Sequence, residues 1–146
     1  MTPAAVLATV LGYIAVLFAV AWISGRRADN AGFFITRGDH RMAVATDLGW
    51  VSDRADHYMR QANYLMIEAN YDNSMLEAGP YPEYLKARIR SATGHLDNEV
   101  TAAYLAQIYT PQLRQIFLCH LSKDNNLPEV ALKAVEQALL AAGVPQ

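Results

Sequence analysis

Three ionisable side chains each end a short apolar run, and a fourth lies in a glycine-led loop. Asp47 ends the run RMAVATD, Glu68 ends NYLMIE and His120 ends RQIFLCH, whereas His95 lies in TGHLDN. Short apolar runs of this kind predict buried strands, and ligand groups of α/β proteins gather at the carboxyl ends of strands. We therefore expect Asp47, Glu68 and His120 to meet in one site, with chemistry based on carboxylate and imidazole groups.

Each of these residues also has an ordinary structural interpretation. Asp47, in ATDLG, could bridge two metal ions, but it could equally cap the helix that follows it. A histidine directly after an apolar strand, such as His120, is often a hydrogen-bonded core residue. His95 suits a loop or capping role as well as a catalytic one. Taken singly, these residues leave both interpretations open.

The elements that must position these residues can be read from apolar runs, turns and capping residues. The three apolar runs predict strands, and residues such as Ser52 and Pro128 mark helix starts. The expected strands are 41–47, 63–68 and 114–120, and the expected helices are 52–61, 82–91, 97–109 and 128–142, with Gly143 after the last. This order of strand, helix, strand, helix, helix, strand, helix predicts an α/β layer structure.

The N-terminal segment differs in composition from the rest of the chain. Residues 4–23 contain no charged side chain, and as a helix they would be about 30 Å long, which matches a bilayer core. The basic pair Arg26–Arg27 follows the segment, so the remaining chain is expected on the cytoplasmic side. We therefore predict a single-pass membrane protein with a cytoplasmic soluble part. A cleaved signal peptide is the alternative, but no basic residue precedes the apolar segment.

The overall composition excludes several classes of protein. The chain has 146 residues, one Cys and a formal net charge of −2. A single Cys excludes a disulfide framework and a cysteine-rich zinc finger. A charge near neutral argues against a polybasic nucleic-acid binder.

The site motifs occur in an order that resembles a known family. TDLG, IEAN, GHLDN and LCHLS, followed by DNNLPE, resemble the C-terminal half of the metallo-β-lactamase superfamily over about residues 41–143. The likeness is greatest to the nuclease-like phosphodiesterase branch, which includes single-domain bacterial exonucleases. The resemblance implies half of an αββα sandwich, and a hydrolase that acts on phosphodiester bonds of nucleic acid.

The resemblance also implies a role for each site residue. Asp47 matches a metal-bridging aspartate and His120 a late histidine ligand, so a divalent metal, zinc or manganese, is implied. Two such ions, about 3.5–4 Å apart, activate water and stabilise both reacting oxygens of a phosphodiester. Glu68 and His95 match a carboxylate–histidine pair that helps to protonate the leaving group. The pair Asn125 and Asn126 matches residues after the last ligand and is expected to contact substrate.

One part of the family's site is missing from the sequence. The family's HxHxDH motif and a further histidine belong to the N-terminal half of its fold, and neither occurs here. A catalytic zinc site generally needs three protein ligands, whereas Asp47 and His120 supply two. We therefore expect an incomplete hydrolase that is inactive alone, unless a second chain supplies the missing half.

The N-terminal segment has a resemblance of its own. Residues 3–38, with SGRRADNAGFFITRG after the apolar run, resemble the first transmembrane segment of sodium:solute symporters. This implies a symporter-like segment over 1–38 and a partial hydrolase domain over 39–146. The alternative functions are a symporter-derived membrane protein fused to a non-catalytic remnant, and a fusion without function.

Overall fold

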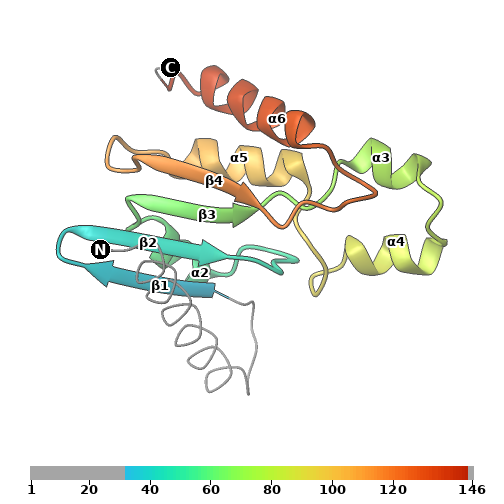
Figure 1. The fold of residues 1–146 in the computed structure, drawn as a ribbon, viewed down its shortest axis with the longest axis horizontal. Helices are drawn as coiled ribbons and strands as arrows, with labels where there is room; N and C mark the ends of the chain where they lie inside the picture. The colour runs from blue at the N-terminus through green and yellow to red at the C-terminus, as the bar shows by residue number, and fades with distance from the viewer. Residues whose placement is uncertain (1–31, 145–146) are drawn as a thin grey trace, which may run out of the picture.

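The computed structural model describes residues 32–144, which form a mixed α/β structure with one four-stranded sheet (Figure 1). The sheet order is β1-β2-β3-β4, so strands that are consecutive in the chain are neighbours in space. The strands are β1 Gly32–Arg37, β2 His40–Ala45, β3 Tyr64–Glu68 and β4 Gln115–Cys119. The helices are α2 Asp53–Met59, α3 Asn73–Ala78, α4 Glu83–Ile89, α5 Asn98–Ile108 and α6 Pro128–Ala141. The α/β class predicted from the sequence is confirmed.

Strands β1 and β2 form an antiparallel hairpin in which Gly32 lies opposite Ala45 and Arg37 lies opposite His40. Gly38 has a φ of 56° in the turn, a left-handed conformation that glycine adopts without steric cost. The polar stretch TRGDH, where the sequence predicts a boundary between two segments, is this turn. Strand β1, which was assigned to the symporter-like segment, therefore pairs with the residues that follow it.

Strands β2, β3 and β4 are parallel, so their carboxyl ends lie at one edge of the sheet (Figure 1). The connection from β2 to β3 contains α2, and the connection from β3 to β4 contains α3, α4 and α5. Parallel neighbours need such crossover connections, because a tight turn can join only antiparallel strands. These crossover connections place the carboxyl ends of the three parallel strands, and the residues directly after them, side by side.

Capping residues start the helices where the sequence predicts. Ser52 accepts a hydrogen bond from the Ala55 backbone N–H at 3.2 Å, and Asp97 accepts one from the Val100 N–H at 2.7 Å. Such caps contribute about 1 kcal/mol each. Leu127, at the start of α6, makes no side-chain capping hydrogen bond, because its apolar side chain has no acceptor atom. Helix α3, which the sequence analysis did not predict, is capped by Asp72.

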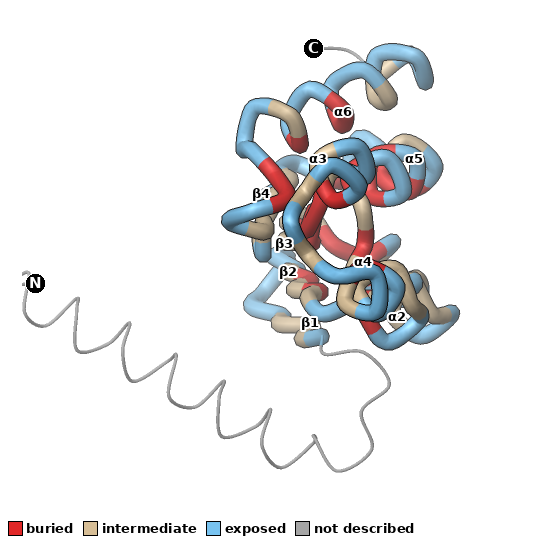
Figure 2. Tube along the Cα trace, turned by 90° about the vertical axis from the view of Figure 1, so that its right-hand side faces the viewer, coloured by how far each residue is buried: buried red, intermediate tan, exposed pale blue. Residues whose placement is uncertain are grey.

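The hydrophobic core lies between one face of the sheet and the helices (Figure 2). Alternate residues of β2 and β3 enter it, including Ala43, Leu65 and Ile67. Leu105 of α5 and Val135 of α6 pack into the same core. Burial of one sheet face by helices fixes the strand register, because a slip by one residue would turn every core side chain outward.

The predicted membrane span over residues 4–23 lies outside the described residues. Between residues 32 and 144, no helix is both long enough and apolar enough to cross a bilayer.

Candidate metal centre

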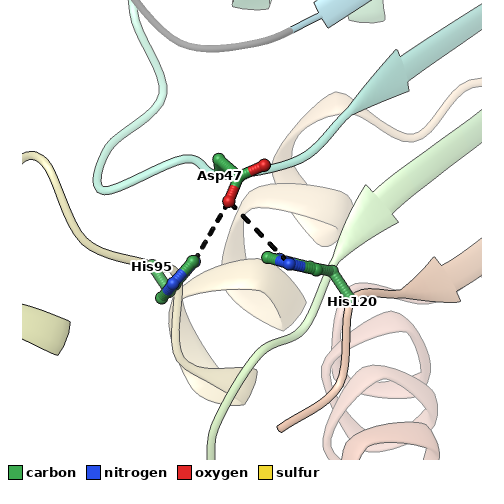
Figure 3. Close-up of side chains that lie close together, drawn as sticks. All are labelled: Asp47, His95 and His120. Atoms are coloured by element: carbon green, nitrogen blue, oxygen red, sulfur yellow. Dashed lines mark ion pairs between the residues drawn. The ribbon is translucent and has the colours of Figure 1, made fainter.

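The four predicted site residues converge at the carboxyl edge of the parallel strands. Asp47 follows β2 by two residues, Glu68 is the last residue of β3, and His120 comes directly after β4. His95 joins them from the loop between α4 and α5. Asp47, His95 and His120 each offer one ligand atom, and these three atoms lie within 4.8 Å of one another (Figure 3).

Glu68 is completely buried at the centre of this group and accepts hydrogen bonds from several donors. Its Oε1 accepts from the backbone N–H of Leu48 at 2.7 Å and of Leu96 at 2.9 Å. Its Oε2 accepts from the Asp47 N–H at 3.0 Å. The same Oε2 lies 2.9 Å from His120 Nδ1 and 3.2 Å from His95 Nδ1. This carboxylate therefore joins the loops that carry all three of the other site residues.

The position of Glu68 determines which ring nitrogens of the two histidines carry protons. An ionised carboxylate only accepts hydrogen bonds, so both Nδ1 atoms must donate to Glu68 Oε2. In the neutral ring, this leaves a lone pair on Nε2, which is the form that binds metal ions. His120 Nε2 lies 3.8 Å from Asp47 Oδ1. An imidazole nitrogen and a carboxylate oxygen are donors that suit zinc, and manganese accepts the same ligand types. The His95 atom near Asp47 Oδ1 is Nδ1, at 4.0 Å.

Two of the site residues have an unusual backbone conformation. Asp47 and His120 are the described non-glycine residues with positive φ, each at 56°. Such residues cost about 1–3 kcal/mol and persist only where the surroundings hold them. At His120, the side-chain amide of Asn70 donates to the backbone carbonyl at 2.6 Å. At Asp47, the N–H donates to Glu68, so both strained turns are held by residues of the β3 end.

Close backbone packing places His95 beside Glu68. A Cβ at Gly94 would lie 2.0 Å from the Ile89 carbonyl oxygen, so only glycine fits before His95. The His95 N–H donates to that same carbonyl at 2.8 Å. On the other side, the Asn70 N–H donates to the Leu96 carbonyl at 2.9 Å. The glycine of the GHLDN motif is thus explained by a tight approach of the loop to the end of α4.

Asn125 and Asn126, which the sequence analysis expects to contact substrate, are buried, with exposures of 1% and 3%. The Asn126 amide donates to Asn98 Oδ1 and accepts from Asn98 Nδ2, both at 2.9 Å. It also donates to the Ala69 carbonyl at 2.7 Å. Asn126 therefore joins the start of α5 and the chain before α6 to the end of β3. Burial points to a structural role for both asparagines.

A pocket of about 340 Å³ opens over the three ligand residues. Its lining also includes Asn70 and Tyr81, which the sequence analysis did not select. Asn70 belongs to the IEAN motif and was detectable from it, whereas the turn sequence GPYP gave no sign that Tyr81 would face a site. The Tyr81 hydroxyl donates to Asp124 at 2.7 Å, and this hydrogen bond raises the pKa of the phenol.

The remaining histidines lie apart from the ligand group, whereas Cys119 directly precedes His120. His57 is exposed on α2, and His40 is exposed at the start of β2. Burial, followed by the nearby charges of Glu68 and Asp47, raises the pKa of the Cys119 thiol to about 11. Cys119 is a half-buried free thiol.

Comparison with known proteins gave matches to two kinds of named exodeoxyribonuclease. The chain is 37% identical over 121 residues to exodeoxyribonuclease YycJ of Bacillus anthracis, covering 83% of this chain and 46% of that protein. It is 38% identical over 112 residues to exodeoxyribonuclease WalJ of Streptococcus pneumoniae, covering 74% of this chain and 42% of that protein. The chain thus spans less than half the length of these curated relatives. No family model and no solved structure matches it.

These similarities correct the predictions made for the N-terminal segment. A match of 121 residues leaves at most 25 of the 146 unmatched, so it reaches back at least to residue 26 and includes β1. The symporter resemblance of residues 3–38 has no support among the matches. The prediction of a single-pass membrane protein is wrong, since the relatives are exodeoxyribonucleases and residues 32–144 contain no helix able to span a bilayer. The chain is therefore similar to bacterial exodeoxyribonucleases over most of its length.

Proposed function

We propose that this chain is part of a metal-dependent phosphodiesterase of the exonuclease type, with DNA as its substrate. The single observation that carries the proposal is the convergence of Asp47, His95 and His120 around the buried Glu68. The names of the relatives support hydrolysis of DNA from its ends. The four-stranded sheet with helices on one face is compatible with the C-terminal half of a metallo-β-lactamase αββα sandwich.

In this proposal Asp47 and His120 are the metal ligands. Glu68 positions His120 for that role through the hydrogen bond at Nδ1, which leaves Nε2 free to bind. When bound, a zinc or manganese ion supplies a Lewis acid that lowers the pKa of water and stabilises charge on the phosphate oxygens. The remaining ligands would come from outside residues 32–144, because the described part of the chain offers no further histidine at the pocket.

His95 and Glu68 form the proton-handling pair. His95 is 27% exposed and lines the pocket, whereas Glu68 is fully buried, so His95 is the member that can reach a leaving oxygen. Glu68 accepts from His95 Nδ1 and stabilises the positive charge of a doubly protonated ring. That ring can then donate a proton from Nε2 to the leaving group. Glu68 acts in this scheme as a positioning residue for His95.

Metal binding to the full chain tests the ligand assignment. Titration calorimetry with Mn²⁺ or Zn²⁺ should show binding that falls by at least about 10- to 100-fold in the variants His120→Ala and Asp47→Asn, since each removes a direct ligand. His57→Ala is the matched control, because His57 is exposed on α2 away from the pocket. Equal affinity in the wild type and His120→Ala would show that the ligand assignment is wrong.

Hydrolysis of end-labelled linear DNA tests the reaction. Because the remaining ligands lie outside residues 32–144, the assay supplies the full chain with the N-terminal part of a relative such as exodeoxyribonuclease YycJ. With added Mn²⁺, this mixture should release nucleotides from the ends, EDTA should stop the reaction, and His95→Ala should slow it about 10²–10⁴-fold. Hydrolysis that persists in EDTA or in Asp47→Asn would contradict a metal-dependent reaction at this site. A mixture that binds the metal ion but leaves DNA intact would contradict the exonuclease assignment.

A further inference from the structure

The pocket over the ligand group has a second part, which the proposed reaction does not use. Besides the three ligand residues, its lining includes side chains with mainly apolar surfaces, which are Tyr81, Ile89 and Leu121. We call these three side chains the apolar wall. The pocket volume of about 340 Å³ lies at the lower end of the range for small-molecule sites, about 300–1,000 Å³. The pocket therefore has room for one small ligand.

The apolar wall is attached to the loops that carry the two site histidines. Leu121 directly follows His120, so their Cα atoms are about 3.8 Å apart. Ile89 is the last residue of α4, and its backbone carbonyl accepts a hydrogen bond from the His95 N–H at 2.8 Å. Helices α3 and α4, which the Tyr81 turn connects, lie beyond the carboxyl ends of the parallel strands (Figure 1). A ligand in the pocket therefore meets apolar side chains and imidazole groups together.

The backbone of Tyr81 is restricted by its neighbours. Tyr81 lies between Pro80 and Pro82, and a residue before a proline is held in extended conformations. Gly79 lets this turn approach the chain before α6, because a Cβ at residue 79 would lie 2.9 Å from Asn125 Oδ1. The turn is therefore placed before a ligand arrives, which lowers the entropy cost of binding.

The hydroxyl of Tyr81 is already engaged within the protein. It donates to Asp124 Oδ2 at 2.7 Å, and a phenol has one proton to donate. The hydroxyl therefore cannot also donate to a phosphate oxygen, and the carboxylate beside it repels a phosphate group. The same hydrogen bond fixes the direction of the ring. What Tyr81 offers to a ligand is thus the face of its ring.

A nucleotide has the same two parts as the pocket. Its phosphate is charged, whereas its base is flat and has a π-face. Bases stack on aromatic side chains of proteins that bind single strands, and one such contact changes affinity by about 5- to 150-fold. In the function proposed above, the phosphate lies at the ligand group. The base is then the part that matches the apolar wall.

We propose that the apolar wall is a nucleobase subsite, in which the ring of Tyr81 stacks on the base next to the phosphate bound at Asp47 and His120. This inference rests on the proposed function, from which it takes a nucleotide as the ligand. Stacking does not read hydrogen-bonding groups, so the subsite accepts all four bases, which suits hydrolysis of DNA of any sequence. A base in this subsite has left the duplex stack, so the pocket takes an unpaired nucleotide.

Binding of two small probes to the full chain tests the subsite. One probe is dTMP, and the other is 2-deoxyribose 5-phosphate, which has the same sugar phosphate without the base. NMR titration gives the dissociation constant of each probe, with and without Zn²⁺. The ratio of the two constants is formed within each variant, so a general loss of binding cancels and the contact to the base remains.

The wild type should bind dTMP about 5- to 150-fold more tightly than the sugar phosphate. Tyr81→Ala should remove most of this preference, whereas Tyr81→Phe keeps the ring and should retain it. Tyr84→Ala is the matched control, because Tyr84 is 77% exposed on α4 and does not line the pocket. A wild type without the preference, or a preference that Tyr81→Ala keeps, would overturn the proposal. So would an equal loss in Tyr81→Phe, which would assign the effect to the hydroxyl.

A second measurement uses the wild type and so does not depend on how a variant folds. Intermolecular NOEs should connect the ring protons of Tyr81 with the thymine H6 and methyl protons of bound dTMP. NOEs from the thymine only to other residues would overturn the stacking. Neither measurement requires hydrolysis or a metal ion. A base preference in a chain that binds no metal ion would refute the proposed function alone, and metal-dependent hydrolysis without that preference would refute this inference alone.

Discussion

Replacement of Glu68 by glutamine tests the idea that one buried carboxylate organises the site. The substitution keeps the size of the side chain but replaces one acceptor oxygen with an NH₂ donor. If the NH₂ group takes the place of Oε1, the backbone N–H groups of Leu48 and Leu96 both lose their acceptor. A buried donor without a partner costs about 1–3 kcal/mol, so this orientation costs about 2–6 kcal/mol.

The other orientation is less costly but changes both histidines. With NH₂ in the place of Oε2, only the Asp47 N–H loses its acceptor, at about 1–3 kcal/mol. His95 and His120 can accept from the new donor if each ring moves its proton from Nδ1 to Nε2. The lower cost selects this orientation. It leaves a proton on the His120 nitrogen that should bind the metal ion.

Glu68→Gln should therefore lose about 1–3 kcal/mol of folding free energy and about 10- to 100-fold in metal affinity. Urea unfolding followed by circular dichroism measures the first quantity, and calorimetry with Zn²⁺ measures the second. Glu136→Gln, on the exposed side of α6, is the control and should change stability by less than about 0.5 kcal/mol. Unchanged stability and affinity in Glu68→Gln would refute the reasoning about the hydrogen-bond network.

Three further substitutions test separate parts of the structure. Gly94→Ala should cost about 1–3 kcal/mol in urea unfolding, because its Cβ would overlap the Ile89 carbonyl, and an unchanged midpoint would contradict the tight loop. Asn126→Ala should cost about 2–4 kcal/mol by leaving buried partners unpaired, and a loss below about 0.5 kcal/mol would contradict its structural role. The pKa of Asp56 is lowered below 3.8, chiefly by its hydrogen bond from Arg60. The stability that the ionised carboxylate contributes is therefore complete above pH 3.8, and it is lost as the pH falls through the lowered pKa of the folded state. Asp56→Asn should therefore be less stable than wild type near neutral pH, and the difference should shrink on acidification, whereas a constant difference would contradict the ion pair.

The parallel part of the fold was predictable because its elements have strong local signals. The apolar runs that end at Asp47, Glu68 and His120 contain β2, β3 and β4, and helices α2, α4, α5 and α6 follow their capping or proline residues closely. Helix α3 was missed because its sequence, NSMLEA, is too short to show a helical period. Local propensity carries little information over six residues.

Strand β1 was missed for a different reason. It follows a long apolar segment, and a polar stretch separates it from β2, so the composition suggested a boundary between two units. The polar stretch is instead a hairpin turn around Gly38. Strand pairing across such a turn depends on partners along the whole hairpin, which a change in composition does not reveal.

The ligand group was predictable from motif order, but the relation between its members was not. The sequence predicts that Glu68 shares a site with His120 and pairs with His95, but it does not predict that one oxygen, Glu68 Oε2, contacts both histidines. The amides of Asn70 and Asn126 show the same limit, since their partners are 28 to 57 residues away in the sequence. Contacts over such separations arise from the sheet topology, and no local pattern reports them.

The most direct test of the proposed metal centre uses the histidine signals of the full chain. The chain contains four histidines, and two of them lie in the ligand group. Titration with paramagnetic Mn²⁺, followed by NMR of the imidazole resonances, should broaden His120 and His95 first and leave His40 and His57 sharp. Zn²⁺ should shift the Nε2 resonance of His120 while its Nδ1 stays protonated against Glu68. Equal broadening of all four histidines, or a proton that remains on His120 Nε2, would contradict a metal site built on Asp47 and His120.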